Sequence, residues 1–347
     1  SVCKMATAYL KLGNVQEAKI WFNLLKDMSK THASDAVFNL GYIDYTEKKY
    51  DEALDAFMSL KNDKVYASLI PYYIGEIYLL REDHAKAEKV STDYLDRFSG
   101  HKDEAEMLRI QGEARYGQEN YLGASASLKA YVERTAVPQR KALYKLGMSH
   151  YHTEAFTDAV SNLGKVTSVD DALAQNAYLH MGLAYLNLRE RNQARMSFEQ
   201  ASLSAHDLGV KEQALYNYAL CLHETSYSPF AESVTVFERF LNEFPSSPYA
   251  EQVNDYLVEV YMNTRSYEAA LQSIAKIQRP GARIMEAKQK ILFHLGTQAF
   301  ANAKMDEAIG YFNESLAIGQ YNATTKADAF YWRGEANYRI GNYGGAY

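Results

Sequence analysis

One pattern recurs along the whole chain of 347 residues and constrains its fold more than any other feature. A typical copy has a small residue, an alanine twelve residues later and a bulky apolar residue four residues further on, as in Gly41, Ala53 and Phe57. The small residue falls at positions 6, 41, 75, 112, 147, 182, 219, 258, 296 and 334, and it is glycine in seven of these ten copies. Because the chain has only 19 glycines in all, this alignment identifies a repeat of 34 to 39 residues.

The spacing within each copy predicts two antiparallel α-helices, since residues three and four apart share one helix face. Glycine or alanine at the contact point lets the two helices approach to the short end of the 8–10 Å range. The bulky residue is expected to fill the gap to the next repeat. The seventh copy departs from the pattern, with Ser233 in place of alanine and two residues inserted around positions 225–229.

A single helical hairpin cannot bury its apolar face alone, so neighbouring copies must stack. The unit resembles the tetratricopeptide (TPR) repeat. This resemblance implies an all-α, right-handed superhelix, or α-solenoid, of about ten repeats. One continuous superhelix over 1–347 is expected, as a fragment of a longer protein. Its repeats would span about 1–33, 34–67, 68–104, 105–139, 140–174, 175–211, 212–250, 251–288, 289–326 and the truncated 327–347. The wider steps in the C-terminal half suggest longer helices there.

A narrower resemblance lies in residues 237–250, which begin Phe237-Glu238-Arg239-Phe240-Leu241 and end Tyr249-Ala250. This segment is similar to a junction in bacterial cell-envelope TPR proteins, including the Tol–Pal-associated and outer-membrane-assembly lipoprotein groups. The similarity implies a location in the periplasm or cell envelope.

The TPR resemblance implies a non-enzymatic scaffold that binds a peptide segment of another protein in a concave groove lined by the first helix of each repeat. Ligand-facing positions lie three residues before, one after and four after the small residue. Tyrosine occurs 29 times in the chain and is frequent at these positions, where it suits recognition of extended peptides. The candidate binding residues are Phe38, Tyr42, Tyr45, Tyr72, Glu76, Arg109, Glu113, Tyr116, Tyr144, Tyr151 and Tyr216. The alternative is that these rings mainly pack against one another.

Three other functions remain open. The same aromatic groove could bind glycans of a cell wall, or the chain could be the sensory region of a larger protein. Self-association is a further possibility, because the last repeat would expose an apolar face where the chain ends within its second helix. Carboxylate-clamp TPRs have Asn one residue after the small residue, and none of the ten copies does; four have Glu there. An acidic partner terminus is therefore disfavoured.

The sequence predicts no catalytic site, metal site or cofactor, because it has no phosphate-binding, dinucleotide-binding, zinc-protease or nucleophile-elbow motif. His150 and His152 are two residues apart on a predicted helix and point in different directions. Cys3 and Cys221 lie in distant repeats, which excludes a disulfide between them and favours two small core residues. Asp170 and Asp171 are expected to cap the following helix.

Charge and hydropathy exclude two classes of partner. The net charge of −6 argues against a nucleic-acid partner. The most apolar stretch, residues 65–80, is too short for membrane insertion and is interrupted by Pro71 and Glu76.

Overall fold

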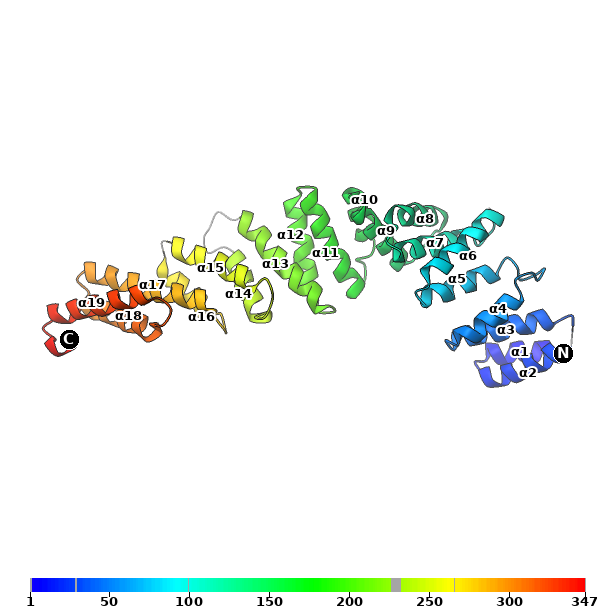
Figure 1. Cartoon of the computed structure of the whole chain (residues 1–347), viewed down its shortest axis with the longest axis horizontal. Coiled ribbons are helices and arrows are strands. Elements are labelled where there is room, and N and C mark those ends of the chain that lie inside the picture. The colour runs from blue at the N-terminus through cyan, green and yellow to red at the C-terminus, as the bar shows by residue number, and fades with distance from the viewer. Residues whose placement is uncertain (1, 29, 99, 226–231, 265, 347) are drawn as a thin grey trace. The chain divides into compact units, whose positions relative to one another are not determined.

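The structure of the protein, a computed structural model, describes residues 2–28, 30–98, 100–225, 232–264 and 266–346. Within these residues all regular structure is helical, with nineteen α-helices and one short 3-10 helix, which confirms the predicted fold class. Contacts divide the chain into two compact units, Ser1–Val169 (unit 1) and Asp170–Tyr347 (unit 2). In each unit successive helices pack side by side in chain order, as in an α-solenoid (Figure 1).

Among its described residues, unit 1 contains five pairs of consecutive helices. They are α1 (Val2–Lys11) with α2 (Val15–Met28), α3 (Ala33–Thr46) with α4 (Tyr50–Ser59), α5 (Ile70–Leu80) with α6 (His84–Arg97), α7 (Glu104–Gly117) with α8 (Tyr121–Arg134), and α9 (Arg140–His152) with α10 (Phe156–Gly164).

Unit 2 contains four further pairs and a final helix followed by the 3-10 turn η1 (Tyr343–Gly345). These are α11 (Ala172–Asn187) with α12 (Arg191–Leu203), α13 (Leu208–Thr225) with α14 (Glu232–Glu243), α15 (Ala250–Asn263) with α16 (Tyr267–Ala275), α17 (Ala282–Ala301) with α18 (Met305–Ile318), and α19 (Ala323–Arg339). The first helices α13, α17 and α19 have 18, 20 and 17 residues, longer than any first helix of unit 1, whereas α15 has 14 and the second helices are not lengthened.

First helices of neighbouring repeats also touch one another. In unit 1 α5 contacts α7 and α7 contacts α9, while in unit 2 α11 contacts α13, and α15, α17 and α19 contact in order. Side chains on these helices can therefore combine into one surface that crosses several repeats. The insertion expected around 225–229 falls mainly on residues 226–231, outside the described residues.

In five repeats the glycine lies directly against the second helix of its own pair, whereas Gly75 lies against Ile110 on α7 of the next repeat; the five are Gly41, Gly112, Gly147, Gly182 and Gly296. A methyl group placed on Gly147 would lie 2.7 Å from Cγ of Leu163, and one on Gly182 would lie 2.6 Å from Cδ1 of Phe198. The bulky residue thus covers the glycine of its own repeat, a role that the sequence-based expectation missed. It can also contact the next repeat as expected, because the rings of Phe57 and Tyr73 are 5.1 Å apart.

The turn inside each repeat has a common backbone geometry. The residue seven positions after the small residue adopts a left-handed conformation in all eight copies where it is described: Gly13, Lys48, Glu82, Glu119, Glu154, Arg189, Ala303 and Gly341, with φ between 57° and 77°. The next amide donates to the carbonyl five residues back, as from Lys49 to Asp44 at 2.8 Å. These contacts are those of a Schellman motif, which ends one helix and allows the next to begin at once.

Ala303→Gly is expected to stabilise the protein by about 0.5 kcal/mol, because glycine adopts the left-handed conformation without the clash of an alanine Cβ. The net stabilisation is smaller than the strain energy that is removed, because glycine also has more conformational freedom in the unfolded chain, which favours unfolding. Urea unfolding would measure it. Gly13→Ala is the matched control: its added methyl meets nothing within 4 Å, so a loss of similar size isolates the backbone effect. A less stable Ala303→Gly variant would contradict this account.

No helix among the described residues is both long enough and apolar enough to cross a membrane.

Candidate functional site

Ten of the eleven candidate binding residues lie in unit 1, on the first helices α3, α5, α7 and α9. Tyr216 lies on α13 in unit 2. Its hydroxyl donates to Gln252 at 2.7 Å, its ring stacks on Tyr249 at 4.4 Å, and it is 8% exposed. Both its hydroxyl and its ring thus have partners within unit 2, so the candidate surface is built from the unit 1 residues.

The aromatic residues of α3 gather around a ring that the sequence analysis did not select. Tyr73 on α5 contacts Phe38 at 5.6 Å, Tyr42 at 6.0 Å and Tyr45 at 5.8 Å, measured between ring centroids. Tyr72 also packs edge-on against Tyr73, at 5.2 Å. Tyr73 therefore fixes the positions of four candidate rings and joins repeat two to repeat three.

A periodic signal for Tyr73 was present in the sequence. It lies two residues before the small residue, and Tyr256, His294 and Trp332 occupy the same position in later repeats. Each contacts an aromatic ring of the preceding repeat: Tyr256 contacts Phe237 at 5.6 Å, His294 contacts Tyr267 at 5.7 Å and Trp332 contacts Phe300 at 5.0 Å. Where it is aromatic, this position joins consecutive repeats. It is not one of the ligand-facing positions, which is why Tyr73 was not among the candidate residues.

Hydroxyl groups separate the tyrosines into two classes. Tyr66 donates to Asp35, Tyr218 donates to Glu232, and the Tyr131 hydroxyl accepts from the Gln139 amide, at distances of 2.8 to 3.1 Å. By contrast, four candidate tyrosines on α3, α5, α7 and α9 have half-buried rings but no hydroxyl hydrogen bond to any described residue. We call these four residues the tyrosine face: Tyr45, Tyr72, Tyr116 and Tyr144. Their hydroxyls are available to a ligand.

All four phenols are protonated at neutral pH, and burial raises their pKa values further above the usual value. Burial raises the pKa of Tyr72 to about 12, with a further contribution from the Glu76 carboxylate, and it raises the pKa of Tyr144 to about 12. Burial and the Glu76 carboxylate also raise the pKa of Tyr45, and burial raises that of Tyr116. Each phenol can therefore act as a hydrogen-bond donor.

A chain of charged side chains crosses three repeats beside the tyrosine face. Arg109 on α7 is 4% exposed and pairs with Glu76 on α5 through Nη2, with Glu106 through Nε at 2.7 Å and with Glu113 through Nη1 at 2.9 Å. The Lys145 ammonium group on α9 in turn donates to Oε2 of Glu113 at 2.6 Å. Arg109 and Glu113, expected as ligand contacts, are thus largely engaged with other residues of unit 1.

The pKa values agree with this pairing. Burial alone lowers the pKa of Arg109, but the carboxylates of Glu76 and Glu113 outweigh it and leave the pKa above its usual value. Burial raises the pKa of Glu113, but Lys145 and Arg109 outweigh it and leave that pKa below its usual value. Both groups are therefore charged at neutral pH, and each depends on the other to be tolerated in the interior.

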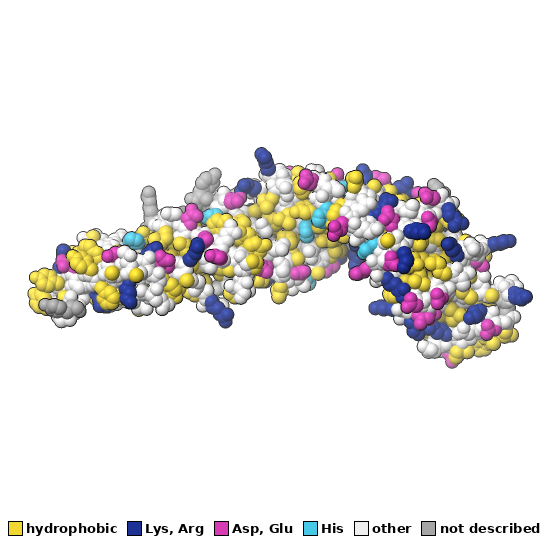
Figure 2. All heavy atoms as spheres, viewed as in Figure 1, with side chains coloured by type: hydrophobic (Ala, Val, Ile, Leu, Met, Phe, Trp, Pro, Cys, Tyr) yellow, Lys and Arg dark blue, Asp and Glu magenta, His cyan; other side chains and the backbone are white. Residues whose placement is uncertain are grey.

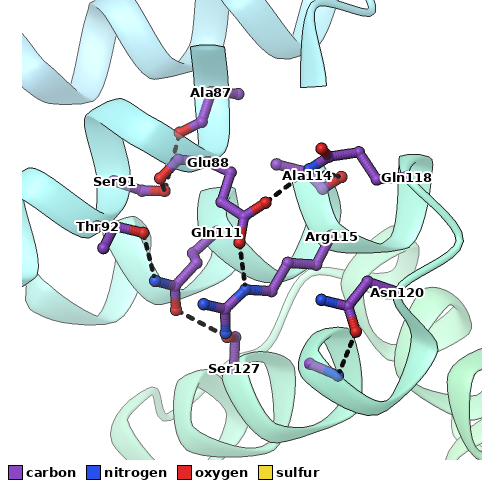
Figure 3. A network of polar contacts seen from close by, with 11 residues as sticks. Ala87, Glu88, Ser91, Thr92, Gln111, Ala114, Arg115, Gln118, Asn120 and Ser127 are labelled. Carbon is purple, nitrogen blue, oxygen red and sulfur yellow. Dashed lines mark hydrogen bonds and ion pairs between the residues drawn. The ribbon is translucent and has the colours of Figure 1, made fainter. Parts of the chain in front are cut away.

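A second polar network holds α7 between α6 and α8 (Figure 3). Arg115 donates to Glu88 at 2.8 Å and to Ser127 at 2.9 Å, and the Ser127 hydroxyl donates to Gln111 at 2.8 Å. Gln111 donates to Thr92 at 2.9 Å. Because Gln111 and Arg115 lie on the same helix as Arg109, Glu113 and Tyr116, this network fixes the rotation of α7 and so the direction of its candidate side chains.

The other predicted residues have ordinary structural roles. Tyr151 packs against His152 and Phe156, both at 5.7 Å, and burial lowers the pKa of His150. The Asp171 side chain accepts from the Ala174 amide at 2.9 Å, which confirms its role as a helix cap.

The neighbouring Asp170 accepts from Ser204 and His206 instead of capping the helix. Neither cysteine forms a disulfide with a described residue; Cys221 is buried, as expected, and Cys3 is half-buried. The described residues contain no group of three His, Cys, Asp or Glu side chains that could hold a metal.

Unit 2 exposes aromatic side chains on α19 and η1, the face for which self-association was predicted. Phe330, Tyr331, Tyr338 and Tyr343 are 49 to 67% exposed and line a depression of about 450 Å³. Figure 2 shows apolar side chains gathered at this end, whereas charges of both signs are intermingled over most of the visible surface. Contact with another copy through this face stays a prediction.

Comparison with known proteins identifies the repeat. Sequence profiles described as tetratricopeptide repeat match residues 111–166 and residues 175–203. No curated protein matches the sequence significantly. Neither profile match includes the junction at 237–250, so the cell-envelope resemblance stays a prediction.

Several solved structures are similar in fold. The MamA protein is 17% identical with a TM-score of 0.42, over 57% of this chain and 98% of its own. A tetratricopeptide repeat protein from Parabacteroides merdae is 15% identical with a TM-score of 0.40, over 75% of this chain and 96% of its own. The C-terminal part of a TPR repeat-containing protein from Cytophaga hutchinsonii is 15% identical with a TM-score of 0.42, over 84% and 98% respectively.

The two profile matches fall one in each unit, on helix pairs whose glycine–leucine and glycine–phenylalanine contacts are described above. Residues 111–166 in unit 1 and residues 175–203 in unit 2 are therefore similar to tetratricopeptide repeats, which typically mediate protein–protein interactions and are generally non-enzymatic.

Proposed function

We propose that unit 1 binds an extended segment of another protein across the tyrosine face. The observation that supports this function is the contrast between hydroxyls. Tyr66, Tyr131, Tyr216 and Tyr218 have hydroxyl partners within their own unit, whereas the four tyrosine-face hydroxyls have none among the described residues. None of the four is among the buried polar atoms that lack a partner, so these hydroxyls remain accessible while their rings are half-buried, a combination that suits contact with a ligand.

The arrangement of these tyrosines suits an extended chain better than a compact ligand. They come from the first helices of four consecutive repeats, and packed helices lie about 8–10 Å apart. An extended peptide advances about 3.3 Å per residue, so about every third residue would meet a new helix. Tyrosine hydroxyls would donate to peptide carbonyls while the rings contact side chains.

The test compares two sets of hydroxyl deletions. Peptides would be selected against the wild-type protein from a phage-displayed random library, and their affinities measured by isothermal titration calorimetry. Replacing Tyr45, Tyr72 and Tyr144 together by phenylalanine is expected to weaken binding at least about tenfold, because each lost hydrogen bond costs about 0.5–1.5 kcal/mol. Thermal unfolding should change little, since these hydroxyls have no partners among the described residues.

Tyr66→Phe and Tyr218→Phe are the matched controls, because they remove hydroxyls that are bonded inside the protein. They should lower stability and leave peptide affinity unchanged. If the triple variant bound every selected peptide as tightly as the wild type, the tyrosine face would not be the binding surface. Competition by neutral oligosaccharides instead of peptides would favour the glycan alternative.

A further inference from the structure

We infer that the Glu76 carboxylate, together with the rings of Tyr45 and Tyr72, receives a lysine or arginine side chain of the bound segment. This inference rests on the proposed peptide-binding function and specifies its partner as a cationic peptide.

The first support is an unused acceptor at Glu76. One of its carboxylate oxygens, Oε1, pairs with Arg109, and the other, Oε2, has no hydrogen bond to any described residue. The Glu76 side chain is 16% exposed, and its Oε2 is not among the buried polar atoms that lack a partner, so this oxygen is accessible. A carboxylate oxygen forms a stronger hydrogen bond with a charged donor than with water or a neutral group.

The second support is the balance of charge around Arg109. Its Nε, Nη1 and Nη2 atoms each pair with a different carboxylate, so the guanidinium has little capacity left for an anionic ligand. Lys145, the nearest other cation of the cluster, pairs with Glu113. Three carboxylates against two cations leave one net negative charge, which an incoming cation would neutralise and an acidic group would oppose.

The third support is the position of the rings. Tyr72 and Glu76 lie one turn apart on α5, and Tyr45 and Tyr72 pack against the same side chain, Tyr73, at 5.8 and 5.2 Å. The carboxylate is close enough to influence the pKa of both phenols. Aromatic faces attract ammonium and guanidinium groups and cover the aliphatic stem that leads to them. Rings and carboxylate together therefore match a lysine or arginine better than an uncharged side chain.

The experiment uses the peptides selected above against the whole chain. Peptides selected by the wild type should share a lysine or arginine at one position, and its replacement by norleucine or citrulline should weaken binding about tenfold. Glu76→Gln keeps the shape and the hydrogen bond to Arg109 but removes the charge. It should bind the cationic and neutral peptides within about twofold of each other. Glu88→Gln is the matched control, because Glu88 also pairs with an arginine but lies on the second helix α6, which carries none of the tyrosine-face residues.

The outcomes separate this inference from the proposed function. Two results would overturn the inference and leave peptide binding standing. In the first, the selected peptides depend on Tyr45 and Tyr72 but share no lysine or arginine. In the second, Glu76→Gln still binds the cationic peptide about tenfold more tightly than the neutral one, as the wild type does. Peptides that bind independently of the tyrosines would overturn both. Glu76 would be established as the group that selects the cation if Glu88→Gln kept the preference for the cationic over the neutral peptide and Glu76→Gln lost it.

Discussion

Gly147→Leu is expected to destabilise the α9–α10 pair by about 3 kcal/mol, at the upper end of the usual cost of overpacking. A methyl group at this position would already lie 2.7 Å from Cγ of Leu163 and 3.1 Å from its backbone nitrogen. Leu163 is fully buried and cannot move aside without disturbing its own neighbours, and a backbone atom can yield only if the two helices separate. The leucine adds three more carbons to this contact.

The measurement is amide hydrogen exchange along α9 and α10, combined with urea unfolding of the whole protein. Exchange locates the loss in one repeat, which matters because stability in stacked repeats is largely a sum of local terms. Gly310→Ala is the control: Gly310 also lies within a helix, but a methyl group there meets nothing within 4 Å. It should stabilise by about 0.5–1 kcal/mol through helix propensity. Unchanged exchange in Gly147→Leu would contradict the repeat register itself.

Arg109→Leu is expected to cost about 3–5 kcal/mol at neutral pH, the usual penalty for removing one partner of a buried ion pair. The guanidinium is 4% exposed and joins the carboxylates of Glu76, Glu106 and Glu113, which come from two different helices. Without it, Glu113 keeps Lys145 as its only described partner at 10% exposure, and the three carboxylates repel one another.

The pH dependence gives this prediction a second readout. In the wild type the lowered pKa of Glu113 contributes stability at pH values above the ordinary glutamate range, and that stability is lost as the pH falls through the folded-state value. In the variant Lys145 still lowers the pKa of Glu113, but the contribution of Arg109 is lost, so the ionised carboxylate contributes less stability. The difference between the two proteins should therefore be largest near pH 7 and shrink as the pH falls below about 5.

Lys145→Met is the matched control for Arg109→Leu, because Lys145 is 29% exposed and pairs with one carboxylate only. Its loss should cost about 1 kcal/mol, as for a partly exposed ion pair. Equal effects of the two substitutions, or a difference that does not depend on pH, would show that Arg109 contributes through its packing and not through its charge.

Much of the fold follows from local spacing. The small residue, alanine and bulky residue of each repeat determine which helix faces meet, because a period of three and four residues defines a face without reference to the rest of the chain. The same periodicity held two unused signals. Tyr73 belongs to a repeated aromatic position, and Gly13 and Gly341 mark the left-handed turn position that six other residues also occupy.

The sequence by itself determined the all-helical class, the helix pairs and the set of side chains on the first helices. Only the tertiary structure decided which of them can meet a ligand. Arg109 finds Glu76 across 33 residues of sequence and Tyr216 finds Gln252 across 36, and such pairings depend on how neighbouring repeats approach each other. Likewise, only the packing between repeats shows that the hydroxyls of Tyr45, Tyr72, Tyr116 and Tyr144 have no partner within the described residues and are not buried.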